Sequence, residues 1–152
     1  MPTYVCSVPQ GLLDEEQKSQ IAQAIGRRHS EATGAQPYFV QVQIDEPPSS
    51  NRYLGGTETS KHIWVRGDIR AGRAEEVRTK LMLNIMEDLS RIAGIPRSAI
   101  WVYLCNLAPT DMLEHGHILP LPGKEKEWFD ALPYSLQQYL KGLGEPAVEM
   151  AH

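Results

Sequence analysis

Hydrophobic and polar positions follow a pattern along this chain that occurs twice. In each copy, a strand-like run of about seven residues precedes a long stretch of helical periodicity, a break that contains glycine, and an apolar strand. The segments 13–48 and 73–108 align at a constant offset of sixty residues without a gap, so that Gly34 meets Gly94. Such a unit is typical of two parallel strands joined by a crossover helix. The sequence therefore predicts an α/β fold with the order β-α-β, repeated twice.

The two predicted helices differ at one position of their apolar stripe. In residues 14–33 the stripe runs through Ile25 to His29, whereas residues 74–93 have Leu89 at the equivalent point. A histidine on an apolar stripe is commonly a hydrogen-bonded core residue. Because the other copy has leucine there, the departure from the repeat favours a functional role for His29.

The last strand of the second copy carries an aromatic residue away from its aliphatic face. In the predicted strand 99–105, Ile100 and Val102 point to one face and Tyr103 to the other, because successive side chains of a strand alternate. The first copy has Gln43 at the position of Tyr103. Tyr103 is therefore expected opposite the aliphatic face.

The length of 152 residues fits one domain that can bury a hydrophobic core. We expect a single domain over residues 1–152. Within it, two fused β-α-β units at about 2–48 and 61–108 precede a C-terminal tail at 109–152.

Short elements are predicted outside the two units. The connection 45–60 is rich in proline and glycine, and it has room for a short hairpin around residues 52–54. In the tail, helical runs are expected near residues 124–131 and 135–143. We therefore treat the connection as part of the domain and not as a linker between domains.

The charge balance excludes several classes of partner. The chain has 15 basic and 19 acidic residues and a net charge of -4, so it lacks the broad cationic surface that binds nucleic acids or anionic membranes. No apolar run approaches the roughly 20 residues of a membrane span, and the polar start predicts no signal peptide. We expect a cytoplasmic protein that binds neither nucleic acid nor membrane. Any anionic ligand must meet a local basic cluster.

Motifs of the common metal and cofactor enzymes are missing from the sequence. Cys6 and Cys105 lie in separate strand-like runs without metal-ligand spacing, so both are expected to be buried free thiols. His115 and His117, together with His62, match no strong zinc pattern. Glycine-rich phosphate loops, nucleophile elbows and Cys-x-x-Cys pairs are absent as well. These absences argue against most common enzyme classes.

The amino terminus offers an unusual candidate for chemistry. Met1 is followed by Pro2 and then directly by a strand-like run. Removal of Met1 would turn Pro2 into a free secondary amine, and a terminal amine has a reference pKa of about 8. Neighbouring charges then decide whether the amine acts as an acid, a base or a nucleophile at neutral pH. The alternative is an ordinary chain terminus without chemistry.

Two arginines stand where the third predicted strand ends and the second helix begins. Arg70 and Arg73 flank a turn, and two guanidinium groups beside a helix N-terminus suit a carboxylate ligand. A solvated pair, or an ion pair between Arg73 and Glu76 along the helix, would explain the same spacing.

Glu114 follows the last strand, where its carboxylate could act as a base or face the solvent.

Several short motifs together resemble a known enzyme family. They are Met-Pro at 1–2, Ile-Arg-Ala-Gly-Arg at 69–73, Trp-Val-Tyr at 101–103 and Met-Leu-Glu-His-Gly at 112–116. With the β-α-β repeat, this set resembles the tautomerase superfamily and, within it, the family of cis-3-chloroacrylic acid dehalogenases, over nearly the whole chain. The resemblance implies a four-stranded mixed sheet with two long helices on one face. It also implies homotrimers of chains that are each fused from two shorter subunits.

The resemblance assigns roles to individual residues. It implies Pro2, Tyr103 and Glu114 for catalysis, and His29, Arg70 and Arg73 for binding the substrate carboxylate. The implied reaction adds water to a small α,β-unsaturated carboxylate without a cofactor or a metal ion. A cis-3-haloacrylate would yield malonate semialdehyde and halide, and propynoate would be hydrated, with or without decarboxylation of the product. Pro2 must be cationic to donate a proton; the arginines lower the pKa of its amine, whereas Glu114 raises it and favours this form.

Two other functions stay open on the sequence alone. A keto-enol tautomerase of an arylpyruvate-like acid would need a neutral Pro2 and an arginine, but not Glu114. A non-catalytic trimeric protein would keep Met1 and use the basic pocket only to hold a carboxylate ligand.

The chain departs from the family pattern at three positions, Ile69, His115 and His117. They border the predicted pocket and are expected to influence which substrate fits.

Overall fold

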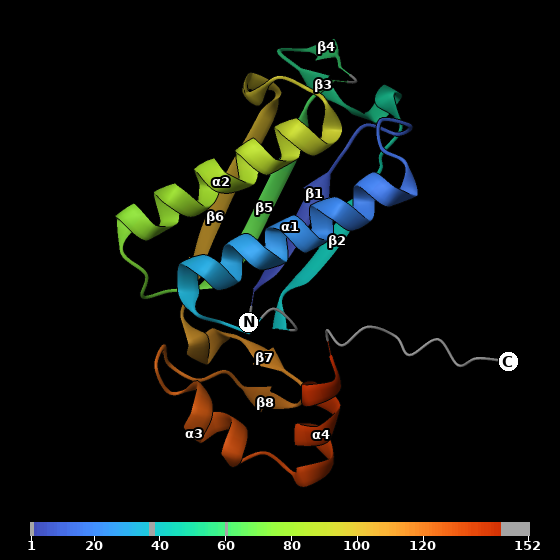
Figure 1. Cartoon of the computed structure of the whole chain (residues 1–152). Helices are drawn as coiled ribbons and strands as arrows, with labels where there is room; N and C mark the ends of the chain where they lie inside the picture. The colour runs from blue at the N-terminus through green and yellow to red at the C-terminus, as the bar shows by residue number, and fades with distance from the viewer. Residues whose placement is uncertain (1, 37–38, 60, 144–152) are drawn as a thin grey trace, which may run out of the picture.

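A four-stranded mixed sheet and two long helices form the body of the protein (Figure 1). The computed structural model describes residues 2–36, 39–59 and 61–143. The elements of the body are β1 (Thr3–Ser7), α1 (Glu15–Thr33), β2 (Gln41–Asp45), β5 (Ile63–Arg70), α2 (Glu75–Ala93) and β6 (Ile100–Leu107). The strands lie in the order β2-β1-β5-β6, parallel within each unit and antiparallel where β1 meets β5. The predicted tandem β-α-β fold, with both helices on one face of the sheet, is confirmed.

Local sequence signals fix the ends of both helices. The Asp14 carboxylate accepts a hydrogen bond of 2.7 Å from the Gln17 backbone N–H, and the Gln17 side chain accepts one of 2.9 Å from the Asp14 N–H. This capping box starts α1 one residue after its cap. Helix α2 begins directly after Ala74, which makes no side-chain cap. Both helices end at a glycine in the left-handed region, Gly34 with φ 76° and Gly94 with φ 68°. The helix bounds therefore match the predicted ones within one residue.

The internal repeat extends further than the sequence predicts. The offset of sixty residues also relates two 3-10 helices, η2 (Ser49–Asn51) and η4 (Pro109–Asp111). It relates two small hairpins as well, β3–β4 (Tyr53–Leu54 with Thr57–Glu58) and β7–β8 (Leu113–Glu114 with His117–Ile118). The first of these is the hairpin predicted around residues 52–54, and the second is its copy.

A pseudo-twofold axis relates the two units. In the antiparallel pair of β1 and β5, Val5 lies opposite Arg66 and Cys6 lies opposite Val65. The sixty-residue offset pairs Val5 with Val65 and Cys6 with Arg66, so the axis passes between these two opposed pairs. At one end of the sheet, β1 therefore begins beside the end of β5. At the other end, β5 begins beside the end of β1.

The hydrophobic core lies between the helices and one face of the sheet. Cys6 is buried there as predicted, whereas Cys105 is only half-buried, because it lies on the sheet face away from the helices. On that same face Trp101 and Tyr103 are exposed, at 37% and 51%. The fully buried side chains of the core include Tyr4, Ile21, Ile25, Ile63, Ile69, Leu81, Ile85 and Leu89.

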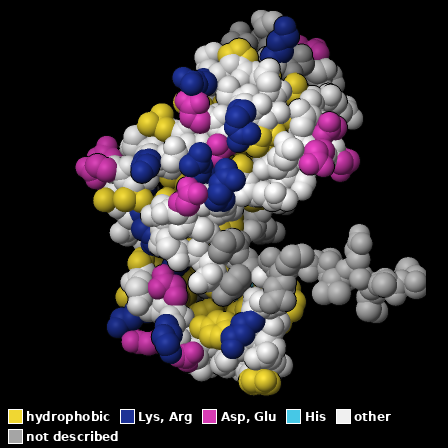
Figure 2. Space-filling model, in the orientation of Figure 1, with side chains coloured by type: hydrophobic (Ala, Val, Ile, Leu, Met, Phe, Trp, Pro, Cys, Tyr) yellow, Lys and Arg dark blue, Asp and Glu magenta, His cyan; other side chains and the backbone are white. Residues whose placement is uncertain are grey.

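Charged side chains of both signs mix over the helical face of the molecule (Figure 2). Ion pairs between charged side chains include Lys18 with Glu46 at 2.6 Å. No helix within the described ranges is long and apolar enough to cross a membrane.

The C-terminal tail lies beside the end of the sheet where β1 begins and β5 ends (Figure 1). It holds hairpin β7–β8 and two short helices, α3 (Glu125–Asp130) and α4 (Tyr134–Gly142). These helices match the predicted runs within one residue at each end. The tail therefore forms a wall next to the first residues of the chain.

Two contacts tie the tail to the turn between β5 and α2. Arg70, the last residue of β5, donates hydrogen bonds to the Pro120 carbonyl at 2.9 Å and to the Glu125 carboxylate at 2.8 Å. Gly72, with φ 118°, leaves room for Pro122, because a Cβ at that position would lie 3.1 Å from Pro122 Cγ. The tail is thus packed directly on the turn that carries the two candidate arginines.

Candidate active site

Four of the six predicted site residues line one small recess. Pro2, His29, Arg70 and Arg73 meet where β1 begins and β5 ends. The antiparallel pairing of β1 with β5 brings the first residues of one strand beside the last residues of the other. Pro2 is buried, and its carbonyl accepts a hydrogen bond of 3.0 Å from the backbone N–H of Gln41.

His29 enters the recess from the last turn of α1 and is 4% exposed. Its Nδ1 atom lies 2.8 Å from the Tyr4 hydroxyl. Burial raises the pKa of Tyr4, so its hydroxyl stays protonated and can donate a hydrogen bond to Nδ1; in that arrangement the imidazole carries its own proton on Nε2. Burial, together with the positive charges of Arg73 and Arg70, lowers the pKa of His29 to about 3. At neutral pH, His29 is therefore a neutral hydrogen-bond donor.

Tyr4 reaches His29 because β5 has a glycine beneath its ring. A Cβ on Gly67 would lie 2.8 Å from Tyr4 Cδ1 and 3.0 Å from Leu104 Cδ2. Real side chains do not approach this closely, so any larger residue at 67 would displace the tyrosine ring. Gly67 is thus part of the support of His29.

The two arginines differ in how many partners they already have. Arg70 is 5% exposed, and its guanidinium is bound by the Pro120 carbonyl and the Glu125 carboxylate. Arg73 has its Nη1 atom buried without a hydrogen-bond partner among the described residues. Burial lowers the pKa of Arg73, and the positive charge of Arg70 lowers it further. The structure shows no ion pair between Arg73 and Glu76 within the described ranges, so that explanation of the spacing is not supported.

Glu114 lies at the end of β7 and lines a pocket that adjoins the recess. Gln41, which bonds to the Pro2 carbonyl, lines this pocket together with Glu114 and His115. Burial raises the pKa of Glu114, although nearby positive groups, Arg70 among them, act in the opposite direction. A carboxyl with a raised pKa beside a catalytic recess is a candidate general base.

Tyr103 lies apart from both the recess and the pocket of Glu114 within one chain. It lies on the sheet face away from the helices, with its ring edge-on to Trp64 at 5.7 Å between centroids. The cavity it lines, of about 370 Å³, also contains Arg52 and His62. His62 is the repeat equivalent of Pro2, so this cavity lies at the place in the second copy that corresponds to Pro2 in the first.

Three residues depart from the family pattern. His115 and His117 lie on the β7–β8 hairpin, and Ile69 lines the recess. His115 has φ 53°, at the position where the first copy has Gly55 with φ 60°. His117 Nδ1 lies 2.9 Å from the His115 carbonyl, and Ile69 is 1% exposed in the recess. No group of three His, Cys, Asp or Glu side chains in the described part of the chain is placed to hold a metal ion.

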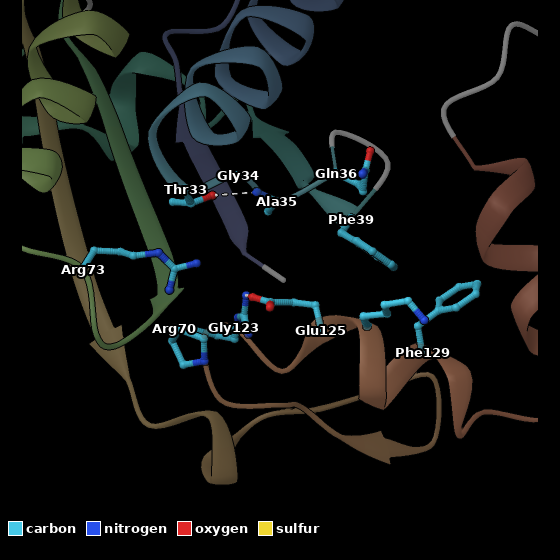
Figure 3. A pocket seen from close by; sticks show the side chains of 12 residues that line it. Thr33, Gly34, Ala35, Gln36, Phe39, Arg70, Arg73, Gly123, Glu125 and Phe129 are labelled. Carbon is cyan, nitrogen blue, oxygen red and sulfur yellow. Dashed lines mark hydrogen bonds and ion pairs between the residues drawn. The ribbon is translucent and has the colours of Figure 1, made fainter.

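A larger cavity opens outward from the recess (Figure 3). Its volume is about 530 Å³, and it shares Thr33, Ala35, Arg70 and Arg73 with the recess. The two arginines stand on one side of the cavity, and Phe39 and Phe129 stand on the other. The remaining lining residues are Gly34, Gln36, Pro122, Gly123, Glu125 and Lys126.

Two residues that support the site have no role in the predictions from sequence. Tyr4 alternates with Val5 on β1 and faces the core, so its hydroxyl needed a polar partner; His29 on the facing stripe is the side chain that supplies it. Glu125 carried no such signal, because its partner Arg70 lies 55 residues earlier and the pairing depends on how the tail folds.

Comparisons with known proteins agree with this geometry. A family model described as "Putative oxalocrotonate tautomerase enzyme" matches residues 1–131. The crystal structure of "N1, a member of cis-3-chloroacrylic acid dehalogenase (cis-CaaD) family" is 34% identical, with a TM-score of 0.88; the match covers 93% of this chain and 99% of that one.

Two further solved structures share the fold. The fused 4-OT "F6", an asymmetric trimer, is 25% identical with a TM-score of 0.73, over 76% of this chain and 94% of its own. Pt0534 inactivated by 2-oxo-3-pentynoate is 24% identical with a TM-score of 0.72, over 83% of this chain and 98% of its own. A search of curated proteins gives no match.

Proposed function

The chain belongs to the cis-3-chloroacrylic acid dehalogenase family of the tautomerase superfamily, and from that membership we propose that it adds water to α,β-unsaturated carboxylates, with Pro2 as its catalytic amine. The observation that carries the proposal is the recess in which Pro2, His29, Arg70 and Arg73 meet. An amine, a neutral imidazole and two guanidinium groups can bind a carboxylate and deliver a proton next to it.

Substrate binding in this proposal begins at Arg73. Its buried Nη1 atom lacks a partner among the described residues, so a substrate carboxylate would supply the missing acceptor. His29 adds a neutral N–H donor, and Arg70 adds charge while it stays bound to Glu125. Positive charge at the carboxylate draws electron density from the conjugated bond, which makes C3 electrophilic.

Glu114 is the proposed base that activates water. It takes a proton from a water molecule as the oxygen attacks C3, and cationic Pro2 delivers a proton to C2. Propynoate then gives an enol that becomes malonate semialdehyde. A cis-3-haloacrylate gives a halohydrin, which loses halide and a proton to form the same aldehyde. The raised pKa of Glu114 supports this role, because it makes the carboxylate a stronger base.

The chemistry requires that Met1 be removed. While a residue precedes it, Pro2 has an amide nitrogen that is neither basic nor able to carry a proton. In the mature chain, the amine would stand at the wall of the recess, where Arg70 and Arg73 lower its pKa and Glu114 raises it.

We also propose that the protein acts as a homotrimer. The fused 4-OT relative is a trimer, and the sheet face away from the helices leaves Trp101 and Tyr103 exposed in a single chain. Tyr103 cannot reach the recess of its own chain, since it lies in the cavity with His62. In the proposed trimer it would assist Glu114 in the recess of a neighbouring protomer.

One observation favours a second candidate function. The cavity of about 530 Å³ outside the recess has Phe39 and Phe129 on its wall, and an aryl group would fit against them. A keto-enol tautomerase of an arylpyruvate-like acid would use this space. It would need neutral Pro2 as a base and Arg73 for the carboxylate, and it would not need Glu114.

Proton NMR of product formation separates the two functions. Protein whose intact mass shows that Met1 is removed would be incubated separately with cis-3-chloroacrylate, propynoate and phenylenolpyruvate. We expect malonate semialdehyde from the first two substrates and none with Pro2→Ala. Glu114→Gln should lower hydration by at least about 100-fold, whereas Glu58→Gln, an exposed carboxylate of the other hairpin, should not. Full activity of Glu114→Gln would contradict the role of Glu114, and ketonisation of the third substrate alone would indicate the tautomerase.

A further inference from the structure

The cavity outside the recess is larger than a three-carbon acid requires. Its volume of about 530 Å³ lies within the range of roughly 300–1,000 Å³ in which much larger ligands are bound. The recess at Pro2, by contrast, has a volume of only about 10 Å³. The recess has room for about one water molecule, so a three-carbon acid at Pro2 would extend into the inner end of the outer cavity, where Arg70 and Arg73 line both spaces. Most of the outer cavity would still hold only water.

The two ends of the cavity differ in chemistry. Arg70 and Arg73 stand at the inner end, next to the recess. Away from them, the wall includes Phe39 and Phe129, and Figure 3 shows the two phenylalanine rings on the side opposite the arginines. A carboxylate held at the inner end would therefore direct the rest of the molecule toward an apolar wall.

The side of the apolar wall that carries Phe129 is fastened by contacts within the protein. Phe129 lies on α3 with Lys141 Nζ 5.6 Å from its ring centroid. The segment before α3 is fastened by the hydrogen bonds of Arg70 to Pro120 and Glu125, and by the contact of Pro122 with Gly72. Figure 2 shows hydrophobic side chains exposed on this C-terminal segment among charged ones.

We infer that the substrate of this enzyme is an unsaturated carboxylic acid with an apolar tail of three or more carbons beyond C3, and that Phe39 and Phe129 select that tail. The inference rests on the proposed function for its reaction, but it concerns the shape of the ligand. Water would add to a 2-alkynoate with its oxygen on C3 and a hydrogen on C2, and the enol would become a 3-oxo acid.

Charge in the cavity sets a limit on the tail. Glu125 lines the same space with its carboxylate bound to Arg70. Besides the arginines, the one cation among the described lining residues is the exposed Lys126, which pairs with Asp130. A second carboxylate on the tail would meet Glu125 before it met a free cation. The selected tail is therefore an alkyl or aryl group.

Binding of saturated acids tests the shape of the ligand without any turnover. Dissociation constants of propanoate, butanoate, hexanoate and octanoate would be measured by ligand-observed NMR. Each methylene buried against the wall should tighten binding by about two- to fourfold, so octanoate should bind at least about 30 times more tightly than propanoate. Phe129→Ala and Phe39→Ala should each flatten the series, whereas Phe129→Leu should keep most of it. Tyr134→Ala removes an aromatic ring that is 75% exposed and outside the cavity, and it should leave the series unchanged.

Turnover of 2-alkynoates tests the same inference in the reaction. The ratio of kcat/KM for 2-hexynoate to that for propynoate should be well above one, and it should fall toward one in Phe129→Ala. A dissociation constant that does not change with chain length would overturn the inference even if propynoate is hydrated. Chain-length dependence of binding without hydration of any alkynoate would instead uphold the shape of the ligand and overturn the proposed reaction.

Discussion

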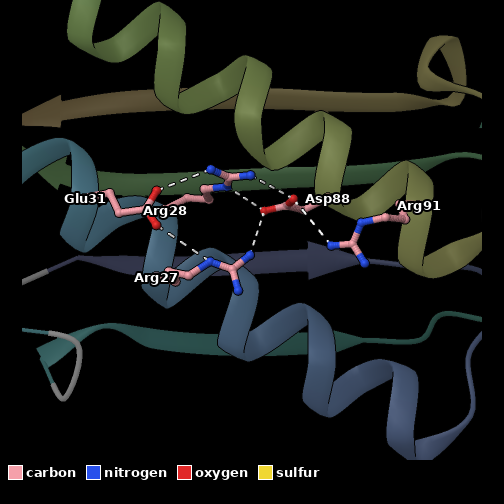
Figure 4. Close-up of polar contacts among 5 residues, drawn as sticks. All are labelled: Arg27, Arg28, Glu31, Asp88 and Arg91. Atoms are coloured by element: carbon pink, nitrogen blue, oxygen red, sulfur yellow. Dashed lines mark hydrogen bonds and ion pairs between the residues drawn. The ribbon is translucent and has the colours of Figure 1, made fainter.

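Arg28 and Asp88 occupy the same position in the two copies of the repeat, sixty residues apart, and they bind each other. Arg28 Nε donates to one Asp88 oxygen at 2.7 Å, and Nη2 donates to the other at 3.1 Å (Figure 4). Arg27 at 3.4 Å and Arg91 at 3.5 Å complete the surroundings of this carboxylate, which is 4% exposed. The pseudo-twofold axis therefore passes close to an ion pair that joins the two helices.

Replacing Asp88 should destabilise the fold without changing the recess. Burial raises the pKa of Asp88, but the hydrogen bonds and charge of Arg28 outweigh this and leave it below its usual value, so the side chain is charged at neutral pH. We expect Asp88→Asn to lower the free energy of unfolding by about 2 kcal/mol, measured by urea denaturation at fixed protein concentration. Glu87→Gln breaks a surface pair with Arg97 and should cost less than about 1 kcal/mol. Equal effects of the two variants would show that the Asp88 ion pair is not structural.

Gly67→Ala should harm both stability and activity. The added methyl group would collide with the Tyr4 ring, and the displaced ring would lose its hydrogen bond to His29. We expect a loss of about 1–3 kcal/mol in the free energy of unfolding and a higher KM for carboxylate substrates. Tyr4→Phe removes the hydroxyl alone, so it should raise KM with a smaller loss of stability. If Gly67→Ala kept a KM equal to that of the parent, the support of His29 by Tyr4 would be contradicted.

The stability of the protein should fall in mild acid because of His29. The folded state lowers the pKa of His29 to about 3, from an ordinary value of 6.5, so folding favours the neutral imidazole. This contribution is complete above pH 6.5 and declines as the pH falls toward 3, by about 1.4 kcal/mol per pH unit. Unfolding free energies of the parent and of His29→Gln would be compared between pH 8 and pH 4. The difference between the two should shrink with falling pH; a constant difference would mean that His29 titrates normally.

The two arginines should respond differently to removal of their charge. Arg70→Met deletes the bonds to Pro120 and Glu125, so it should lower the free energy of unfolding by about 2 kcal/mol as well as the activity. Arg73→Met leaves these bonds in place and should mainly raise KM, by roughly 10- to 100-fold, the loss of one charge-assisted hydrogen bond. Thermal unfolding and steady-state kinetics on both variants check this. Equal destabilisation by the two substitutions would contradict the division of roles.

The fold was predictable because its signals are local. Asp14 and the glycines at 34 and 94 mark helix ends within a few residues of the chain, and the strand pattern needs only neighbouring side chains. The equivalence of the two hairpins is not visible in the sequence, because His115 replaces Gly55 and few other residues match. Similar backbone conformations, with positive φ at both positions, reveal it in the structure.

The candidate site was predictable where a residue departs from the repeat, and not where it depends on long-range packing. His29 stood out because its counterpart is Leu89, and the structure places it in the recess with Pro2. The bond between Arg70 and Glu125 could not be foreseen, since it depends on the path of the tail. For Tyr103 the sequence predicted the face of the strand, yet only the finished sheet shows that this face leads away from the recess.

Because of the pseudo-twofold arrangement, each position in one unit has an equivalent position in the other unit that serves as an internal control. Ser30 and Ser90 accept the same hydrogen bond from Gly34 and Gly94, at 2.8 Å and 3.0 Å, in helices of equal length and on the same sheet. A substitution on the side of Pro2 can therefore be matched with the same substitution sixty residues away, in a nearly identical backbone. Effects common to both report on the architecture of the unit, and effects found in only one report on chemistry that the other copy does not perform.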